Sequence, residues 1–145
     1  MAKQKRKIQK NQSILWIGII GILLIVLVGV TLASQSSSQT LPNEITVDEA
    51  YQKYQEGAFV LDVRTQEEWD EYHAPNTTLI TLDQLPNRVN EVPQDQEIVV
   101  ICRSGNRSQV GRDILRDAGF DQVTSTAGGL KAWSAAGYPI EGTRP

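Results

Sequence analysis

The chain has 145 residues, of which 40% are hydrophobic, and a formal net charge of −3. A single cysteine excludes an internal disulfide, so the fold must depend on packing alone. Five basic residues lie in the first ten positions, whereas all 17 acidic residues and the other nine basic ones lie after residue 43, which gives that part a net charge near −8. This acidic balance disfavours a nucleic-acid partner.

The first predicted element is an uncharged segment, residues 14–33, rich in Ile, Leu, Val and Gly. Twenty helical residues at roughly 1.5 Å each span about 30 Å, the thickness of a bilayer's hydrocarbon core. The basic tail, residues 1–13, predicts a cytoplasmic N-terminus, a single-pass signal anchor in the lipid bilayer and a domain exported to the periplasmic or extracellular face. A cleavable signal peptide is the alternative, although its apolar region usually has only about 7–15 residues.

A Ser/Gln-rich segment, residues 34–43, comes next and is typical of a flexible linker. Residues 44–145 are then expected to form one folded domain, because about 100 residues suffice for one modest core. The first pattern in it predicts a helix. Thr46 and Glu49 have the spacing of a capping box, apolar residues behind them share one helical face, and Gly57 can end the helix.

The next patterns alternate between strand and helix. They predict a buried strand over residues 58–63, a short helix capped by Thr65 and Glu68, a strand over residues 79–82 and a helix over residues 85–92. Pro86 fits the last of these only in its first turn.

Residues 98–101 (IVVI) form the most apolar run after the linker and predict the central strand. The helix after it is expected to bury one face and to end at Gly119; the residues of that face are Val110, Ile114, Leu115 and Ala118. Val123 begins a last strand, and Gly128-Gly129 lead into a final turn of helix. Strands that alternate with helices predict an α/β domain with a mostly parallel central sheet flanked by helices.

The loop after the predicted central strand, residues 102–108 (CRSGNRS), carries the candidate chemistry. Ligands of open α/β sheets bind at the carboxyl edge of the strands, where Cys102 is expected. Successive loop amides and a helix N-terminus concentrate positive potential there, which favours a reactive thiolate. Gly105 allows the positive φ that such a loop requires.

Side chains of the same loop add to this potential. Arg103 and Arg107 are permanent cations that can pair with an anionic substrate, and Ser108 is a suitable N-cap for the next helix. The rival interpretation is an ordinary polar loop whose arginines face water and whose cysteine is a small buried hydrophobe.

The sequence CRSGNRS resembles the active-site loop of the rhodanese family, whose bacterial members commonly carry Cys-Arg-Ser-Gly-x-Arg-Ser. Two further motifs in the right order resemble the family's signatures: LDVR with EEW (residues 61–69), and GGL, Trp133 and AGYPI (residues 128–140). The resemblance covers nearly all of residues 44–145 and implies a rhodanese-like fold.

The resemblance also implies a thiosulfate-type sulfurtransferase mechanism. Cys102 attacks the outer sulfur of thiosulfate or a similar anionic donor, releases sulfite and passes its persulfide sulfur to a thiol or protein acceptor. The loop stabilises the negative sulfur much as an oxyanion hole does, and the residues expected to bind the donor are Arg103, Ser104, Gly105, Asn106 and Arg107. No cofactor is implied, and the sequence has no metal-ligand cluster or nucleotide-binding loop.

Other motif residues are expected to support the site. Asp62 and Arg64 are interpreted as a supporting polar pair, and Ser108 as support for the loop. His73 is the single histidine, and its family counterpart is structural. Residues 73–77 read HAPNT where the family usually has His-Ile-Pro-Gly-Ala, which predicts a locally altered turn.

Two other functions remain open. Phosphatases and arsenate reductases of related fold space cysteine and arginine as C-x5-R, whereas Cys102 and Arg107 are one residue closer, which suits a single sulfur atom. A non-catalytic rhodanese module would instead serve as a membrane-anchored sulfur carrier, sensor or docking domain. Inactive modules of the family often lose the cysteine or the loop glycine, and this loop retains both.

Overall fold

The structure, a computed structural model, describes residues 41–143. The expected tail (residues 1–13), the expected membrane anchor (residues 14–33) and most of the expected linker lie outside the described residues, so these predictions stay untested. Between residues 41 and 143, no helix is both long enough and apolar enough to cross a membrane.

The domain is built on a five-stranded parallel sheet with the strand order β1-β6-β5-β2-β4. In that order the strands are Glu44–Ile45, Val123–Thr126, Ile98–Ile101, Phe59–Asp62 and Thr78–Leu79. The helices are α2 (Val47–Gln55), α3 (Gln66–Glu71), α4 (Leu85–Arg88), the 3-10 helix η1 (Val89–Glu91), α5 (Asn106–Asp117) and α6 (Gly129–Ala135). A small antiparallel pair joins β3 (Tyr72–His73) to β7 (Glu141–Gly142). The predicted α/β class with a mostly parallel sheet is confirmed.

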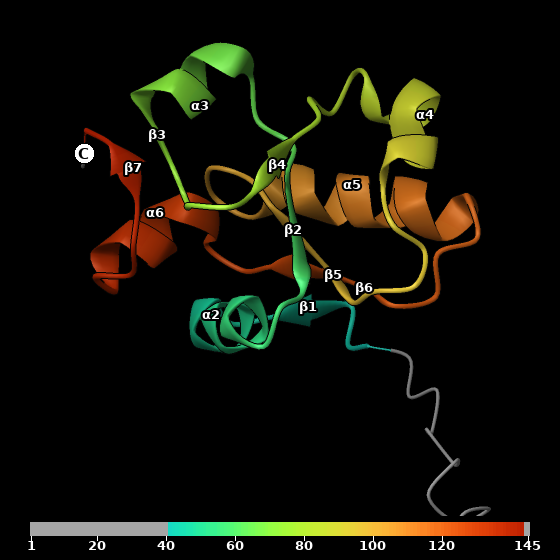
Figure 1. Ribbon diagram of the computed structural model, residues 1–145, viewed down its shortest axis with the longest axis horizontal. Helices are drawn as coiled ribbons and strands as arrows, with labels where there is room; N and C mark the ends of the chain where they lie inside the picture. Colours follow the sequence, from blue (N-terminus) through green and yellow to red (C-terminus); the bar gives the residue numbers. More distant parts are fainter. Residues whose placement is uncertain (1–40, 144–145) are drawn as a thin grey trace, which may run out of the picture. The chain divides into compact units, whose positions relative to one another are not determined.

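Strand β5 lies in the middle of the sheet, between β6 and β2, and both of its faces are covered. Ile98 and Val100 pack in one core cluster with residues of α4 and α5, whereas Val99 and Ile101 pack in a second cluster with residues of α2 and α6. Figure 1 shows α4 and α5 together on one side of the fold and α2 on the opposite side. A strand buried on both faces must be apolar at every position, as residues 98–101 are.

Local signals predicted the helix starts well. Both capping boxes are present: Thr46 and Glu49 cap α2, and Thr65 and Glu68 cap α3, each through reciprocal side-chain and backbone hydrogen bonds. Pro86 lies in the first turn of α4, as its missing N–H requires. The strand predicted over residues 79–82 is displaced: β4 is Thr78–Leu79 and overlaps the prediction only at Leu79.

The buried face of α5 differs from the prediction. Val110 is 50% exposed and Ala118 is also exposed, and the buried residues of the helix are Ser108, Gly111, Arg112 and Leu115. A side chain at Gly111 would come within 3.1 Å of Val100, so the missing side chain lets the helix lie close on β5. Because of this close approach, the face of α5 that packs on the sheet differs from the face that the apolar pattern predicts.

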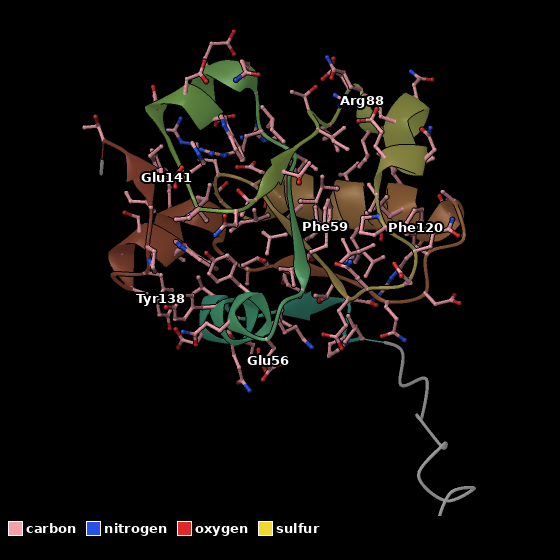
Figure 2. All side chains as sticks on the ribbon, in the orientation of Figure 1. Glu56, Phe59, Arg88, Phe120, Tyr138 and Glu141 are labelled. Carbon is pink, nitrogen blue, oxygen red and sulfur yellow. The ribbon has the colours of Figure 1, made fainter. Side chains whose placement is uncertain are left out.

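An aromatic cluster attaches α6 to α2. Tyr138, labelled in Figure 2 beside α2, stacks on Tyr51 with ring centroids 3.9 Å apart and donates to Asp48 at 2.6 Å. The buried Trp133 packs edge-on against Tyr51 and donates from Nε1 to the carbonyl of Pro139. These contacts fix α6, whose first turn contacts the loop after β5.

Candidate active site

Cys102 is the first residue after β5 and has no exposed surface. The backbone N–H of Gly105 donates to its Sγ at 3.1 Å, and α5 begins at the next residue, Asn106. Gly105 takes a φ of +102°, a backbone conformation that a residue with a side chain rarely adopts. The predicted sequence of strand, thiol-bearing loop and helix N-terminus is therefore present at the carboxyl edge of the sheet.

The floor of the loop is formed by the first turn of α6. Leu130 donates its backbone N–H to the carbonyl of Cys102 at 2.7 Å, and Lys131 donates to that of Arg103 at 3.1 Å. Gly129 precedes them with a φ of +57°, and a Cβ atom there would overlap the Cys102 carbonyl oxygen. Only glycine fits at this contact, so the close approach of α6 to the loop depends on Gly129.

Asp62 and Arg64 form a fully buried pair, each side chain being 1% exposed. The Nε of Arg64 donates to both carboxylate oxygens of Asp62, and its two terminal nitrogens also donate to the carbonyls of Glu68 and Tyr72 at 2.8 Å. Burial raises the pKa of Asp62, while the charge and hydrogen bonds of Arg64 oppose that rise. Every guanidinium nitrogen of Arg64 thus donates a hydrogen bond, and the pair links α3 and β3 to the end of β2.

Glu68 joins the loop to α3, a contact that sequence reasoning missed. Arg107 donates to its two carboxylate oxygens at 2.7 and 2.8 Å, and Arg103 lies 3.7 Å from the same carboxylate. The hydrogen bond from Arg107 is the main cause that lowers the pKa of Glu68 to about 2. The sequence contained only a weak signal for this contact: an acidic capping-box residue in one motif and a cationic loop in another.

The remaining loop residues have distinct surroundings. Ser104 and Asn106 are exposed at the rim of the loop. The prediction that Ser108 caps α5 is wrong, because Gly105 occupies the N-cap position. Ser108 lies within the first turn instead, where its buried hydroxyl donates to the carbonyl of Gly105 at 2.6 Å and so supports the loop from below.

His73 takes a structural position. Its ring stacks on Trp69 with centroids 4.0 Å apart, Nδ1 lies 3.0 Å from the Trp69 carbonyl, and Nε2 lies 3.2 Å from Glu141. Both ring nitrogens thus tie α3 to β7. Over residues 41–143, no group of three or more His, Cys, Asp or Glu side chains is arranged to hold a metal ion.

The family model for the Rhodanese-like domain matches residues 46–136, well over half of the chain. The chain belongs to the rhodanese family. A solved relative, a rhodanese-related protein from Thermoplasma volcanium, has a TM-score of 0.64 and 27% identity over 69% of this chain and 98% of its own.

Two curated relatives carry functional names. The "Putative sulfur carrier protein YrkF" of Bacillus subtilis (strain 168) is 32% identical over 103 residues, which is 70% of this chain and 55% of that protein. A "Sulfurtransferase" of Allochromatium vinosum is 33% identical over 85 residues, which is 59% of this chain and 79% of the relative. This chain thus spans little more than half the length of the Bacillus protein.

Gly129→Ala tests the contact below the loop. We expect this substitution to lower the free energy of unfolding by about 3 kcal/mol or more, because the added carbon overlaps the Cys102 carbonyl and the residue has a positive φ. Gly119→Ala is the matched control, since Gly119 has a φ of +92° but nothing within 4 Å of the added carbon. It should lose only about 1 kcal/mol. Equal losses in urea unfolding would refute the role assigned to Gly129.

Glu68→Gln tests the ion pair through pH. Because the folded-state pKa is lowered from 4.5 to about 2, the pair contributes its full stability above pH 4.5 and loses it as the pH falls towards 2. We expect Glu68→Gln to be about 1 kcal/mol less stable than the parent chain at pH 7, and this difference to shrink by pH 3. Chemical unfolding at both pH values measures it. A difference that is constant or grows in acid would contradict the assignment.

Proposed function

We propose that this rhodanese is a sulfurtransferase that carries sulfur as a persulfide on Cys102. The observation that supports this best is the Gly105 amide, which donates to Sγ at 3.1 Å within a loop that leads into the N-terminus of α5. Amides and a helix N-terminus stabilise negative charge, first on the thiolate and then on the outer sulfur of the persulfide. The names of the two curated relatives agree with sulfur transfer or carriage.

The proposed transfer has two balanced steps. The Cys102 thiolate attacks the outer sulfur of thiosulfate, an S–S bond forms to Sγ, and the bond to the sulfonate sulfur breaks. The electron pair of that bond leaves with sulfite, and Cys102 keeps the sulfur as a persulfide anion. A thiolate acceptor then attacks the outer sulfur and takes it, which returns the Cys102 thiolate. No external oxidant or reductant is required.

Thiosulfate is proposed as a donor because the loop carries cationic side chains. Arg103 is 51% exposed at the mouth of the loop, and the exposed Ser104 and Asn106 offer hydrogen-bond partners to sulfonate oxygens. The acceptor is proposed to be a small thiol or a cysteine of a partner protein.

A sulfur carrier without catalytic turnover is the second candidate, since the Bacillus relative is named a putative sulfur carrier protein. A carrier and an enzyme share the Cys102 persulfide and differ in how its sulfur leaves. An enzyme releases product repeatedly in the presence of donor and acceptor, whereas a carrier gives one sulfur per chain unless its own partner is present.

We also propose that residues 14–33 anchor the chain in a membrane with the rhodanese domain exported. Five basic residues before an uncharged span support this orientation. The linker, residues 34–43, then separates the domain from the bilayer. At its far end, the Asn43 carbonyl accepts hydrogen bonds from Arg112 and from the backbone of Ser125, so this end of the linker is attached to the domain.

Treatment with thiosulfate should add one sulfur to the chain, about +32 Da by intact mass, through the covalent step above. Cyanide should remove it. Cys102→Ser should lose both the adduct and turnover while it retains the fold, because serine has nearly the volume of cysteine and the buried hydroxyl costs only about 1–3 kcal/mol. Circular dichroism checks that the variant is folded. A chain that takes up no sulfur from thiosulfate would refute thiosulfate as a donor, and a Cys102→Ser chain that still takes up sulfur would refute the proposed role of Cys102.

A reporter fused after Pro145 tests the topology. An enzyme that is active only outside the cytoplasm should be active in this fusion, since the five basic residues hold the tail inside. The full-length chain should remain with the membrane fraction after a high-salt wash. A soluble product that begins near Ser34 would show cleavage and would overturn the anchor, whereas a reporter active only in the cytoplasm would overturn the orientation.

A further inference from the structure

Glu68 compensates part of the positive charge that Arg103 and Arg107 give to the loop. Its carboxylate accepts two hydrogen bonds from Arg107, at 2.7 and 2.8 Å, and lies 3.7 Å from Arg103. The Glu68 side chain is 17% exposed and that of Arg107 is 33% exposed, so water screens this half-buried pair only in part. The pair also raises the pKa of Arg107, with the Glu68 hydrogen bond as the largest cause and the charge of Cys102 as a smaller one.

The charge balance around the thiol results from one ion pair and one linked group of three charged side chains. Arg107 and Arg103 share Glu68, and Arg64 pairs with Asp62 while it also donates to the Glu68 carbonyl. These three guanidiniums and two carboxylates leave one net positive charge, which a Cys102 thiolate neutralises. A thiosulfate dianion therefore finds no uncompensated side-chain charge in this cluster and must compete with Glu68 for Arg107.

Arg107 also lines a groove with a mostly apolar surface. It has a volume of about 450 Å³, and its apolar lining residues are Val63, Leu82, Val110 and Ile114. Val63 comes directly after the paired residues of β2 and β5, as Cys102 does on the neighbouring strand, and both residues belong to the same core cluster. Cys102 does not itself line the groove, which is connected to the active-site loop through Arg107. Val110 is the one large hydrophobic side chain that is exposed among residues 41–143. Such a groove can hold the carbon body of an organic donor, which thiosulfate lacks.

We propose that Glu68 determines donor specificity, and that the site takes sulfur from an organic persulfide (R–S–SH) in preference to thiosulfate. Glu68 acts as a positioning residue: it holds Arg107 away from an incoming dianion. This inference rests on the proposed sulfurtransferase function. In the transfer step, the Cys102 thiolate attacks the outer sulfur of R–S–SH and forms an S–S bond. The S–S bond between the inner and the outer sulfur of the donor breaks, and its electron pair leaves with the thiolate R–S⁻.

The test compares two donors on the full chain, thiosulfate and cysteine persulfide. The readout is the initial rate of the +32 Da adduct at each donor concentration, which gives a half-saturating concentration and a maximal rate. The variant is Glu68→Gln, which keeps the capping-box geometry and can still bond Arg107 but removes one negative charge. The matched control is Glu67→Gln, an exposed neighbour in the same turn with the same change of charge.

For the parent chain we expect a higher ratio of maximal rate to half-saturating concentration with cysteine persulfide than with thiosulfate. Glu68→Gln should lower the half-saturating thiosulfate concentration about three- to ten-fold with little change in maximal rate, because only the competition for Arg107 is relieved. In the same variant, the half-saturating concentration of cysteine persulfide should change less than about two-fold. Glu67→Gln should leave the half-saturating concentrations of both donors unchanged.

The same substitution in a chain that lacks Arg107 shows whether Glu68 acts through Arg107. In an Arg107→Gln chain, Glu68→Gln should no longer improve thiosulfate use, since the residue that it holds is absent. A preference for thiosulfate in the parent chain, equal effects of the two glutamate variants, or a gain that persists without Arg107 would each overturn the inference while sulfur transfer stands. Failure of both donors to load Cys102 would overturn the proposed function and this inference with it.

Discussion

The active-site loop depends on one backbone contact, the hydrogen bond from the Leu130 amide to the Cys102 carbonyl at 2.7 Å. The contact is possible because Gly129 has no side chain, since a Cβ atom would overlap that carbonyl oxygen. Helix α6 is held at this distance by Trp133, which is buried against α2. Packing in the C-terminal third of the domain thus fixes the shape of a loop about 25 residues earlier, and with it the Gly105 amide that faces the sulfur.

Backbone and side chains contribute unequally to the electrostatics of this loop. Glu68 offsets one of the two side-chain charges of Arg103 and Arg107, whereas the Gly105 amide, at the N-cap of α5, donates directly to the sulfur. Amides held by the fold need no reorganisation when negative charge develops, which is why they stabilise it efficiently. Glu68 also caps α3, so one side chain fixes both a helix start and the charge presented to a substrate.

The sequence predicted those features that depend on local signals. Both capping boxes, the apolar run of β5 and the thiol-bearing loop after it were found because each is encoded within about ten neighbouring residues. Strand order and the Glu68–Arg107 pair were not, because they join residues that are far apart in sequence, 39 positions in the case of the pair. The buried face of α5 was missed for a related reason: it results from the close approach at Gly111 to another element.

Cys102 is proposed to hold the transferred sulfur under the amides of its loop, and a crystal structure of the sulfur-loaded chain tests this most directly. It should show a second sulfur bonded to Sγ, with its outer atom within hydrogen-bond distance, about 3.5 Å, of backbone N–H groups between Arg103 and Arg107. A second sulfur that points away from these amides, or an unmodified thiol in protein that has been loaded with donor, would contradict this role of the loop.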